Sequence, residues 1–590
     1  MPLSNSGLPE WLSGYASDVY DWHKISENDG RTTYWRRMGM VEGLFHCDGA
    51  DFEGRADLNM NLRIEVRTSL PLEDYRQRIA KAWSIFRQQH ILVSAAAAKV
   101  RDFDKSGKLA QARAFVFRPS MNPRAMLDEG NQQLVFVGDD YPDLDVDDFY
   151  THITNSARAI DGSVALAKLH VMPFAHSTTS SFGVHFMLIA AHQIVDGLTT
   201  FAFMNSFIDV LNLTDLQLDQ LAKQLCREDP TSRLPPAQET LYPPIQGSLA
   251  RQRWFWAITR ILRHTKKLNP PAFLNPVYRN VPLPNAVRFP PKYDRVLDYS
   301  RVPPLNNYHV NATLSSVSTA RLRQLCREAS ISVGSGLFAL VAITMMLLHE
   351  KRCPDIPLEE REPFIGSFPV NPRPFLASNP PPDSLMLAFS EGIAMPFLPS
   401  DLPFEGRFRL LGKIAHRKLK IYQKRKRTLH EEAALGTQSG AQLLPSLYCS
   451  TTDRLEMRSK PEDRMGWDLQ GPYAIPEAKR WGTCGISSVG DRSGLIRRGR
   501  YDVSGLPEGK DTVVDFRDLG STVRARDGEF LVGAAGEKDW LGFGVSYDGC
   551  AVDPKRAEEW KRLIEGILED GGIGGRKDGE LAAVVEKARL

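Results

Sequence analysis

A proline-rich stretch in the middle of the chain, residues 229–304, most constrains the fold. It contains RLPPAQETLYPPIQG, NPPAFLNPVYRNVPLP and FPPKY, and proline repeatedly excludes long helices and central strands there. We interpret it as a linker that crosses the surface of two halves, residues 1–228 and 305–570. A chain of 590 residues is too long for one core, so at least two domains are expected. Residues 571–590 open with GGIGG and are expected to form a flexible tail.

Both halves alternate strand and helix patterns. In the first half, 58–66 has the pattern of a strand and 72–90 has apolar residues at helical spacing. In the second half, 310–318 is predicted to be a strand, and Ser318 is suited to capping the helix that follows. The expected fold class is therefore α/β (α+β), with a mixed β-sheet and helices in each half. A cleft between such halves is a favoured place for a ligand.

Composition excludes several functional classes. A net charge of +3 over 590 residues gives no reason to expect a nucleic-acid partner. The seven cysteines are scattered without metal-ligand spacing, so we expect free thiols, a reduced compartment and no metal site. The N-terminus lacks the pattern of a secretory signal, and the apolar run 337–348 is too short to span a bilayer, which predicts a buried helix. We expect a cytoplasmic monomer without stable membrane insertion.

Two basic segments are predicted to be surface helices. Residues 250–267 place Trp254, Ile258, Ile261 and Leu262 on one face, which fits a lid, a membrane-interface helix or a helix docked on the protein. Residues 413–427 alternate basic and apolar residues. That pattern favours a long helix with a solvated face over a nucleic-acid patch.

The chemistry is predicted around the stretch AAHQIVDGLTT. His192 follows the apolar run 184–191, which has the pattern of a strand buried on both faces, and helical spacing resumes after Gly197. His192 would thus lie at the carboxyl end of a strand, where ligands meet the sheets of α/β proteins. A second interpretation stays open, in which His192 is a core residue and Asp196 only caps the helix.

This H-x-x-x-D-G pattern resembles the signature of the superfamily of chloramphenicol acetyltransferase, nonribosomal-peptide condensation domains, plant BAHD acyltransferases and fungal acetyltransferases. Three later segments resemble family motifs in the same order: PFIGSFPVNPRPFL, TCGISSVGD and LGFGVSYDG. The BAHD motif D-F-G-W-G is absent, and VVDFRDLG (513–520) is a distant echo of it. This favours a stand-alone acyltransferase of the fungal type. DLGSTV, 518–523, is not interpreted as a carrier site, because its surroundings have the pattern of a strand and hairpin.

The resemblance implies two chloramphenicol-acetyltransferase-like subdomains that enclose a tunnel. It implies direct transfer to a small-molecule hydroxyl or amine, with His192 as general base, Asp196 paired with an arginine, acyl-CoA as co-substrate and no tightly bound cofactor. The sequence contains no G-x-S-x-G nucleophile elbow, which agrees with direct transfer without an acyl-enzyme. Supporting residues are expected at Gly197, Asn371 and Arg373, the last being the candidate partner of Asp196. Ser487, Ser488 and Gly490 are candidates for the oxyanion site or tunnel wall, and Arg497, Arg498 and Arg500 for binding the CoA phosphate.

Two other functions remain open at this point. One is a condensation-like enzyme that takes its acyl donor from a carrier protein, and turnover with free acyl-CoA would distinguish it. The other is a binding or scaffold protein that kept the fold and lost turnover.

Overall fold

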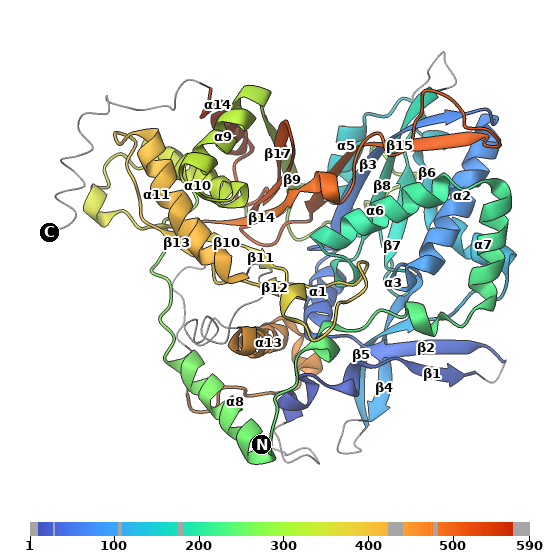
Figure 1. Ribbon diagram of the computed structural model, residues 1–590, viewed down its shortest axis with the longest axis horizontal. Coiled ribbons are helices and arrows are strands. Elements are labelled where there is room, and N and C mark those ends of the chain that lie inside the picture. The colour runs from blue at the N-terminus through green and yellow to red at the C-terminus, as the bar shows by residue number, and fades with distance from the viewer. Residues whose placement is uncertain are drawn as a thin grey trace.

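The protein consists of two sheet-and-helix halves that lie side by side, with smaller elements below them (Figure 1). The computed structural model describes residues 10–27, 30–103, 109–174, 181–422, 440–473, 475 and 482–569. The predicted tail, 571–590, and the end of the basic run, 423–427, lie outside these ranges.

A five-stranded sheet forms the first half, in the order β15-β3-β8-β7-β6. Its strands are β3 (Leu58–Thr68), β6 (Leu134–Phe136), β7 (Ala167–Val171), β8 (Ser181–Ala190) and β15 (Thr512–Val523). Neighbouring strands are antiparallel except β6 and β7. The order places a strand from near the C-terminus beside the first long strand of the chain, as its orange-red colour against blue shows (Figure 1).

Helices cover both faces of this sheet, which explains the apolar run of β8. Phe186 and Leu188 point into a core shared with the helices on one face, whereas Met187 and Ile189 pack with α5 on the other. The helices of this half are α2 (Leu72–Gln89), α3 (Ile91–Ser94), α4 (Pro123–Asn131), α5 (Val146–Thr154), α6 (Gly197–Leu211) and α7 (Asp215–Arg227). A strand buried on both faces has no need of polar alternation.

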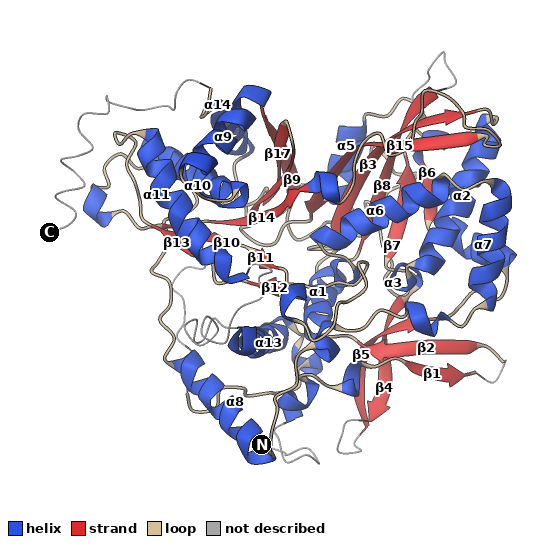
Figure 2. Ribbon diagram, in the orientation of Figure 1, coloured by secondary structure: helices blue, strands red, loops and turns tan. Residues whose placement is uncertain are grey.

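A six-stranded mixed sheet forms the second half, in the order β13-β10-β14-β16-β17-β9. Its strands are β9 (Asn307–Leu314), β10 (Phe364–Ser367), β13 (Ile393–Met395), β14 (Cys484–Asp491), β16 (Phe530–Glu537) and β17 (Trp540–Asp548). Its helices are α9 (Ser316–Glu328), α10 (Val333–Arg352), α11 (Phe404–Leu419) and α14 (Pro554–Gly566), and they gather beside this sheet (Figure 2). α10 is the one helix in the described ranges that is long and apolar enough to cross a membrane, and 78% of its apolar window is buried.

Smaller elements complete the molecule. A four-stranded antiparallel sheet has the order β1-β2-β5-β4, and a two-stranded ribbon joins β11 to β12. Their bounds are β1 (His23–Ser26), β2 (Thr32–Arg37), β4 (Ala96–Phe103), β5 (Leu109–Phe117), β11 (Pro369–Val370) and β12 (Ala388–Phe389). Three further helices, α1 (Met40–Asp51), α8 (Leu249–His264) and α13 (Gly440–Arg458), lie near these elements. The ribbon and α1 border the space between the two halves (Figure 1).

Three sequence-based boundaries are corrected. The range 305–570 assigns β15 to the second half, but β15 pairs with β3, and its Val514 and Phe516 are buried in the first core. For the same reason the predicted strand and hairpin around DLGSTV, residues 516–533, is not a hairpin, because β15 and β16 belong to different sheets. The predicted strand 310–318 ends at Leu314, since Ser315 rather than Ser318 caps α9.

The proline-rich linker holds the two halves together. Phe273 and Val277 are buried in the second core, whereas Tyr293 and Leu297 are buried against the first sheet. Proline-rich backbone suits this course, because it crosses two cores without needing the hydrogen bonds of a central strand.

The predicted helix 250–267 exists as α8, but with a different buried face. Trp254 is 67% exposed, whereas Trp256, Thr259 and Arg263 are buried. Arg263 forms an ion pair with Asp453 of α13. This polar contact helps to bury the face of α8 that carries Arg263, which the positions of the apolar residues do not predict. α8 is therefore docked on the protein.

Asn212 binds β15, the strand that crosses over from the second half, to the first half. Its side-chain amide donates to the carbonyl of Val514 and accepts from the Val514 amide, each at 2.9 Å. Both residues are buried, so the contact supplies β15 with hydrogen bonds on the edge away from β3.

We expect Asn212→Ala to lower the free energy of unfolding by about 2–4 kcal/mol, because it strands two buried backbone groups. Asn212→Asp, which keeps the acceptor but buries a carboxylate against the Val514 carbonyl, should cost at least as much. Urea unfolding measures both, and hydrogen exchange should show loss of protection in 512–523. Unchanged protection there would contradict this account of the strand.

Candidate active site

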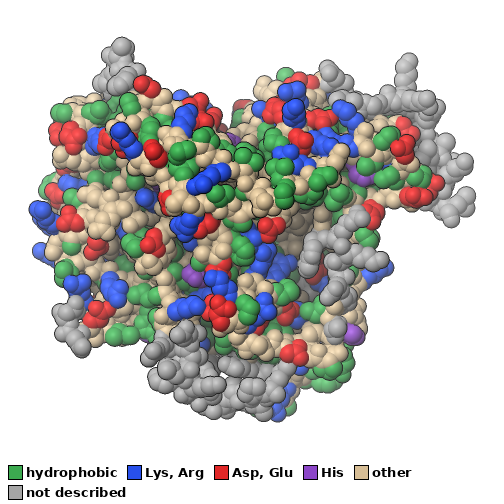
Figure 3. Space-filling view, turned by 180° about the vertical axis from the view of Figure 1, so that it is seen from behind, with side chains coloured by type: hydrophobic (Ala, Val, Ile, Leu, Met, Phe, Trp, Pro, Cys, Tyr) green, Lys and Arg blue, Asp and Glu red, His purple; other side chains and the backbone are tan. Residues whose placement is uncertain are grey.

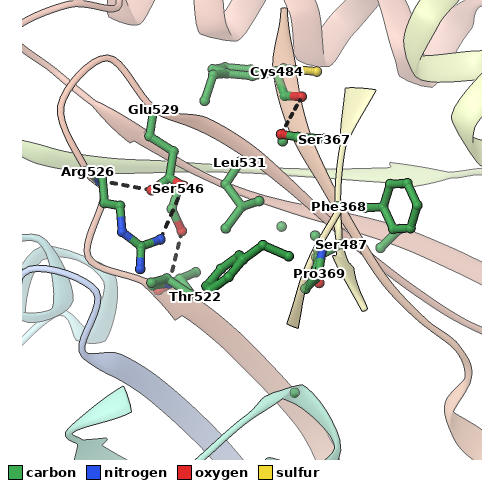
Figure 4. A pocket seen from close by; sticks show the side chains of 18 of the residues that line it. Ser367, Phe368, Pro369, Cys484, Ser487, Thr522, Arg526, Glu529, Leu531 and Ser546 are labelled. Carbon is green, nitrogen blue, oxygen red and sulfur yellow. Dashed lines mark hydrogen bonds and ion pairs between the residues drawn. The ribbon is translucent and has the colours of Figure 1, made fainter. Parts of the chain in front are cut away.

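A cavity of about 1270 Å³ lies between the two halves. In the space-filling view the molecule is hollowed there, with Lys and Arg side chains inside the hollow (Figure 3). Both halves supply its wall: Phe45 and His192 come from the first, and Phe368 and Ser487 from the second. In the close-up, Arg526 and Thr522 lie on the opposite side from Ser487 and Phe368 (Figure 4).

His192 lies just beyond the carboxyl end of β8. The strand ends at Ala190, and His192 begins a short 3-10 turn, His192–Ile194, two residues later. The ring atom Nδ1 is buried and makes no hydrogen bond of good geometry with the described residues. His192 lines the cavity, and its Nε2 is not among the buried atoms without a partner.

An aromatic stack fixes the imidazole plane. The ring of Phe45, on α1, lies parallel to the His192 ring, with an interplanar angle of 7° and 3.8 Å between centroids. The guanidinium of Arg526 lies 5.3 Å from the centroid of the Phe45 ring. Neither partner was found from the sequence, because α1 and the loop after β15 carry no motif.

The surroundings hold the imidazole in its neutral form. Burial, and after it the charge of Arg526, together lower the pKa of His192 from its ordinary value to about 4. The backbone carbonyls of His192 and Val195 and the carboxylate of Asp196 oppose this shift. At pH 7 the ring is thus uncharged and able to accept a proton.

Asp196 accepts hydrogen bonds from both halves and does not line the cavity. Its Oδ1 caps α6, accepting from the amides of Leu198 and Thr199, each at 2.8 Å. Its Oδ2 accepts from the guanidinium of Arg373 at 2.8 Å and from the Met386 amide at 2.9 Å. The two roles weighed for Asp196, helix cap and arginine partner, are present together. The carboxylate is 2% exposed and fully bonded.

Arg373 is itself held from two sides. Its backbone amide and guanidinium both donate to Asn371 Oδ1, at 3.1 and 3.3 Å, so Asn371 orients it. The guanidinium also donates to the Ser384 carbonyl at 2.7 Å. The segment that contains Ser384 and Met386 is thereby bound to the turn after His192.

A histidine anchors the same segment on the first half. His90, at the end of α2, lies 2.8 Å from Asp383 through Nδ1 and 2.8 Å from Ser206 of α6 through Nε2. This Ser–His–Asp arrangement lies away from the residues that line the cavity. Its effect is to tie the 383–386 segment to α6.

The two candidate serines are separated by the pleat of β14. Ser487 is half-buried and lines the cavity, whereas Ser488 is exposed and accepts from the Gly490 amide at 3.2 Å. Gly490, at φ +75°, follows an irregularity in the strand at Val489. Val489 would lie 3.5 Å from a side-chain carbon placed on Gly197, so β14 abuts the start of α6 at the cavity. Ser487 is the serine placed to meet a ligand.

The predicted CoA-binding arginines do not line the cavity. Arg500 lies 2.9 Å from Asp209 of α6, and Arg497 and Arg498 are exposed to solvent. The basic residues of the cavity wall lie elsewhere: Arg263, Lys266, Arg454, Arg458, Arg492 and Arg526. Sequence reasoning missed them because they lie on separate segments that meet only in the folded chain.

Comparison with known proteins gives a fold. No protein-family model and no curated protein matches this sequence. The solved structure of TRI3 trichothecene 15-O-acetyltransferase from Fusarium sporotrichioides aligns with a TM-score of 0.60, over 94% of this chain and 98% of that chain, at 12% identity. The first condensation domain of the calcium-dependent antibiotic synthetase aligns with a TM-score of 0.48, over 91% and 97%, at 10% identity. The chain has the two-subdomain fold of chloramphenicol-acetyltransferase-like proteins, as expected, and its activity must be argued from its site.

Replacing His192 should lower turnover, whereas replacing Asp196 should lower stability. His192→Ala should lower any turnover by about 10²–10⁴-fold, the usual loss for a general base, with little change in melting temperature. Asp196→Ala should lower the free energy of unfolding by about 3–5 kcal/mol, because it leaves the Arg373 charge buried without its partner. Asp196→Asn keeps a helix cap and should be less destabilised. Equal melting temperatures for wild type and Asp196→Ala would refute the supporting role.

The lowered pKa of His192 predicts an acid limb well below neutrality. A base with its pKa near 4 stays deprotonated down to weakly acidic pH, so kcat/KM should fall only as pH drops through about 4, not 6.5. Arg526→Gln removes a charge that lowers this pKa and should move the limb to higher pH. The pH profile of the two proteins measures this, and a wild-type limb at 6.5 would contradict the assignment of the base.

Proposed function

We propose that this protein is an acyltransferase that moves an acyl group from acyl-CoA to a hydroxyl or amine of a small-molecule acceptor, with His192 as general base. One observation carries the proposal: the imidazole of His192, stacked on Phe45, lines a cavity formed by both halves. A histidine with only a core role would have a hydrogen-bond partner for its ring and would not line a cavity.

The reaction proceeds by direct attack. The acceptor oxygen attacks the thioester carbonyl carbon while its proton passes to Nε2 of His192. The hydroxyl of Ser487, on the cavity wall, is the proposed donor to the oxyanion that forms. Collapse of this intermediate breaks the carbon–sulfur bond, and the proton on His192 passes to the leaving thiolate. No acyl-enzyme forms in this scheme.

The supporting residues act through position. Asp196 and Arg373 hold the turn that carries His192, because their ion pair joins α6 to the 384–386 segment. Gly197 faces the cavity at the start of α6, where it leaves room for a reactant. A displaced imidazole would lose rate even with its chemistry intact, since proton transfer needs hydrogen-bond distance.

The test is turnover with a panel of acyl-CoAs and of alcohols and amines, read by free-thiol release and product mass. We expect thiol release that depends on an acceptor and that falls about 10²–10⁴-fold in His192→Ala. Ser487→Ala should lower kcat with KM little changed, because an oxyanion donor acts only in the transition state.

The same acyl groups on a carrier protein form the comparison arm. Transfer from the carrier alone would replace the CoA donor with the condensation-like reaction. Thiol release that persists unchanged in His192→Ala would refute the mechanism.

A further inference from the structure

One arginine in the cavity wall lacks a counterion. Arg454, on α13, lines the cavity half-buried, and its guanidinium lies 5.1 Å from the centroid of the Phe389 ring. Among the described residues it forms no ion pair and no hydrogen bond. A guanidinium removed from water normally pairs with an acid or accepts a lowered pKa.

The charges near Arg454 do not compensate it. Burial lowers the pKa of Arg454, and the charges of Arg526 and Arg458 lower it further, with no acid opposing them. Asp48, a carboxylate of the same cavity wall, is already shared: it lies 2.9 Å from Arg526, 3.1 Å from Arg55 and 3.9 Å from Arg458. Asp527 also pairs with Arg55 at 2.7 Å, and Glu529 lies 3.8 Å from Arg526, so four arginines and three carboxylates leave one positive charge in excess beside the cavity.

Other basic residues of the wall are neutralised. Arg263 pairs with Asp453, Lys266 with Glu391, and Arg492 with Asp518 and Glu537. The unpaired charge of Arg454 is therefore a local feature and not a general positive potential of the cavity.

Two aromatic rings connect Arg454 to the proposed base. The Phe389 ring that it covers is 6.1 Å from the ring of Phe45, which stacks on His192. Arg526 covers the same Phe45 ring at 5.3 Å. The guanidinium groups of Arg454 and Arg526 thus lie over two neighbouring aromatic rings, one of which stacks on His192. The phosphates of a CoA whose thioester reached His192 would lie a pantetheine arm away, so these arginines face the reacting groups.

We propose that Arg454, assisted by Arg526, binds a carboxylate of one of the two reactants, so that the enzyme transfers an acyl group to or from a carboxylate-bearing molecule. The assignment of the carboxylate to the acceptor or the donor rests on the proposed function, whereas the carboxylate-binding site does not. A single excess cation matches a single carboxylate, and the planar fork of arginine accepts one through two hydrogen bonds. The aromatic rings of Phe45 and Phe389 would cover the apolar part of such a ligand.

Binding tests the site without turnover. The probes are mandelate, salicylate and hydroxydecanoate, each against its own primary amide, titrated calorimetrically at low salt. We expect the carboxylates to bind and the amides to bind at least about tenfold more weakly. Arg454→Met should weaken the carboxylates about 10- to 100-fold, the loss of a charge-assisted contact. Arg454→Lys should restore part of it. Equal affinity for acids and amides would overturn the proposal.

Lys266→Met is the matched control. It removes another cation of the cavity wall whose charge Glu391 already offsets, so carboxylate affinity should change by no more than about twofold. A loss as large as in Arg454→Met would mean that general charge, and not the Arg454 site, binds the carboxylates.

Stability gives a second readout of opposite sign. Removing a half-buried, uncompensated charge should raise the melting temperature of ligand-free Arg454→Met, as is common when a binding residue is replaced. A structural arginine would instead lower it. A lower melting temperature together with undiminished carboxylate binding would refute the proposal.

Turnover then identifies the source of the carboxylate. One arm pairs butyryl-CoA with hydroxy acids or their amides, and the other pairs neutral alcohols with succinyl-CoA or butyryl-CoA. Arg454→Met should lower kcat/KM about 10- to 100-fold only in the arm that supplies the carboxylate. Carboxylate binding that depends on Arg454 without turnover in any arm would refute the acyltransferase and leave the site. If kcat/KM does not depend on the carboxylate in either arm, the Arg454 site is refuted and the acyltransferase proposal stands.

Discussion

The buried carboxylate of Asp196 is the contact on which the site depends. A carboxylate taken out of water must be fully hydrogen-bonded, and Asp196 meets this need with donors from both halves of the chain. Its bonds to the first turn of α6 fix where the helix begins, and hence the turn that starts at His192. Its bonds to Arg373 and Met386 fix that turn against the second half. The base is therefore positioned by the assembly of the two halves.

The crossing strand makes that assembly hard to separate. β15 leaves the second half, completes the first sheet beside β3, and returns through a loop whose Arg524 donates to the backbone of the first half, including the carbonyl of Ile153 at 2.6 Å. Arg526 follows two residues later and reaches the ring of Phe45. The loop that ties the halves together thus also supplies a charge beside the base.

The cavity combines an uncharged base with charges that disfavour its protonation. Arg526 lowers the pKa of His192, and Arg526 and Arg458 lower that of Arg454. Such like-charge proximity costs stability, and residues kept at that cost are commonly functional. A bound carboxylate would offset part of this charge and raise the basicity of His192 when the reactants are in place. Binding and proton transfer would then be coupled through one electrostatic cluster.

The sequence by itself determined the local features of this protein. The apolar run before His192 predicts a strand buried on both faces. A helix cap is one of the two roles that the sequence leaves open for Asp196, because its carboxylate can bond amides two and three residues later. The family resemblance implies two similar subdomains and a pairing of Asp196 with an arginine, for which Arg373 is the candidate. Only the tertiary structure decided the rest. β15 joins the first sheet, Phe45 stacks on His192, and Arg454 and Arg526 line the cavity, whereas Arg497, Arg498 and Arg500 do not. These contacts join segments far apart in the chain, and no local propensity or spacing encodes which distant surfaces meet when two cores close over one cavity.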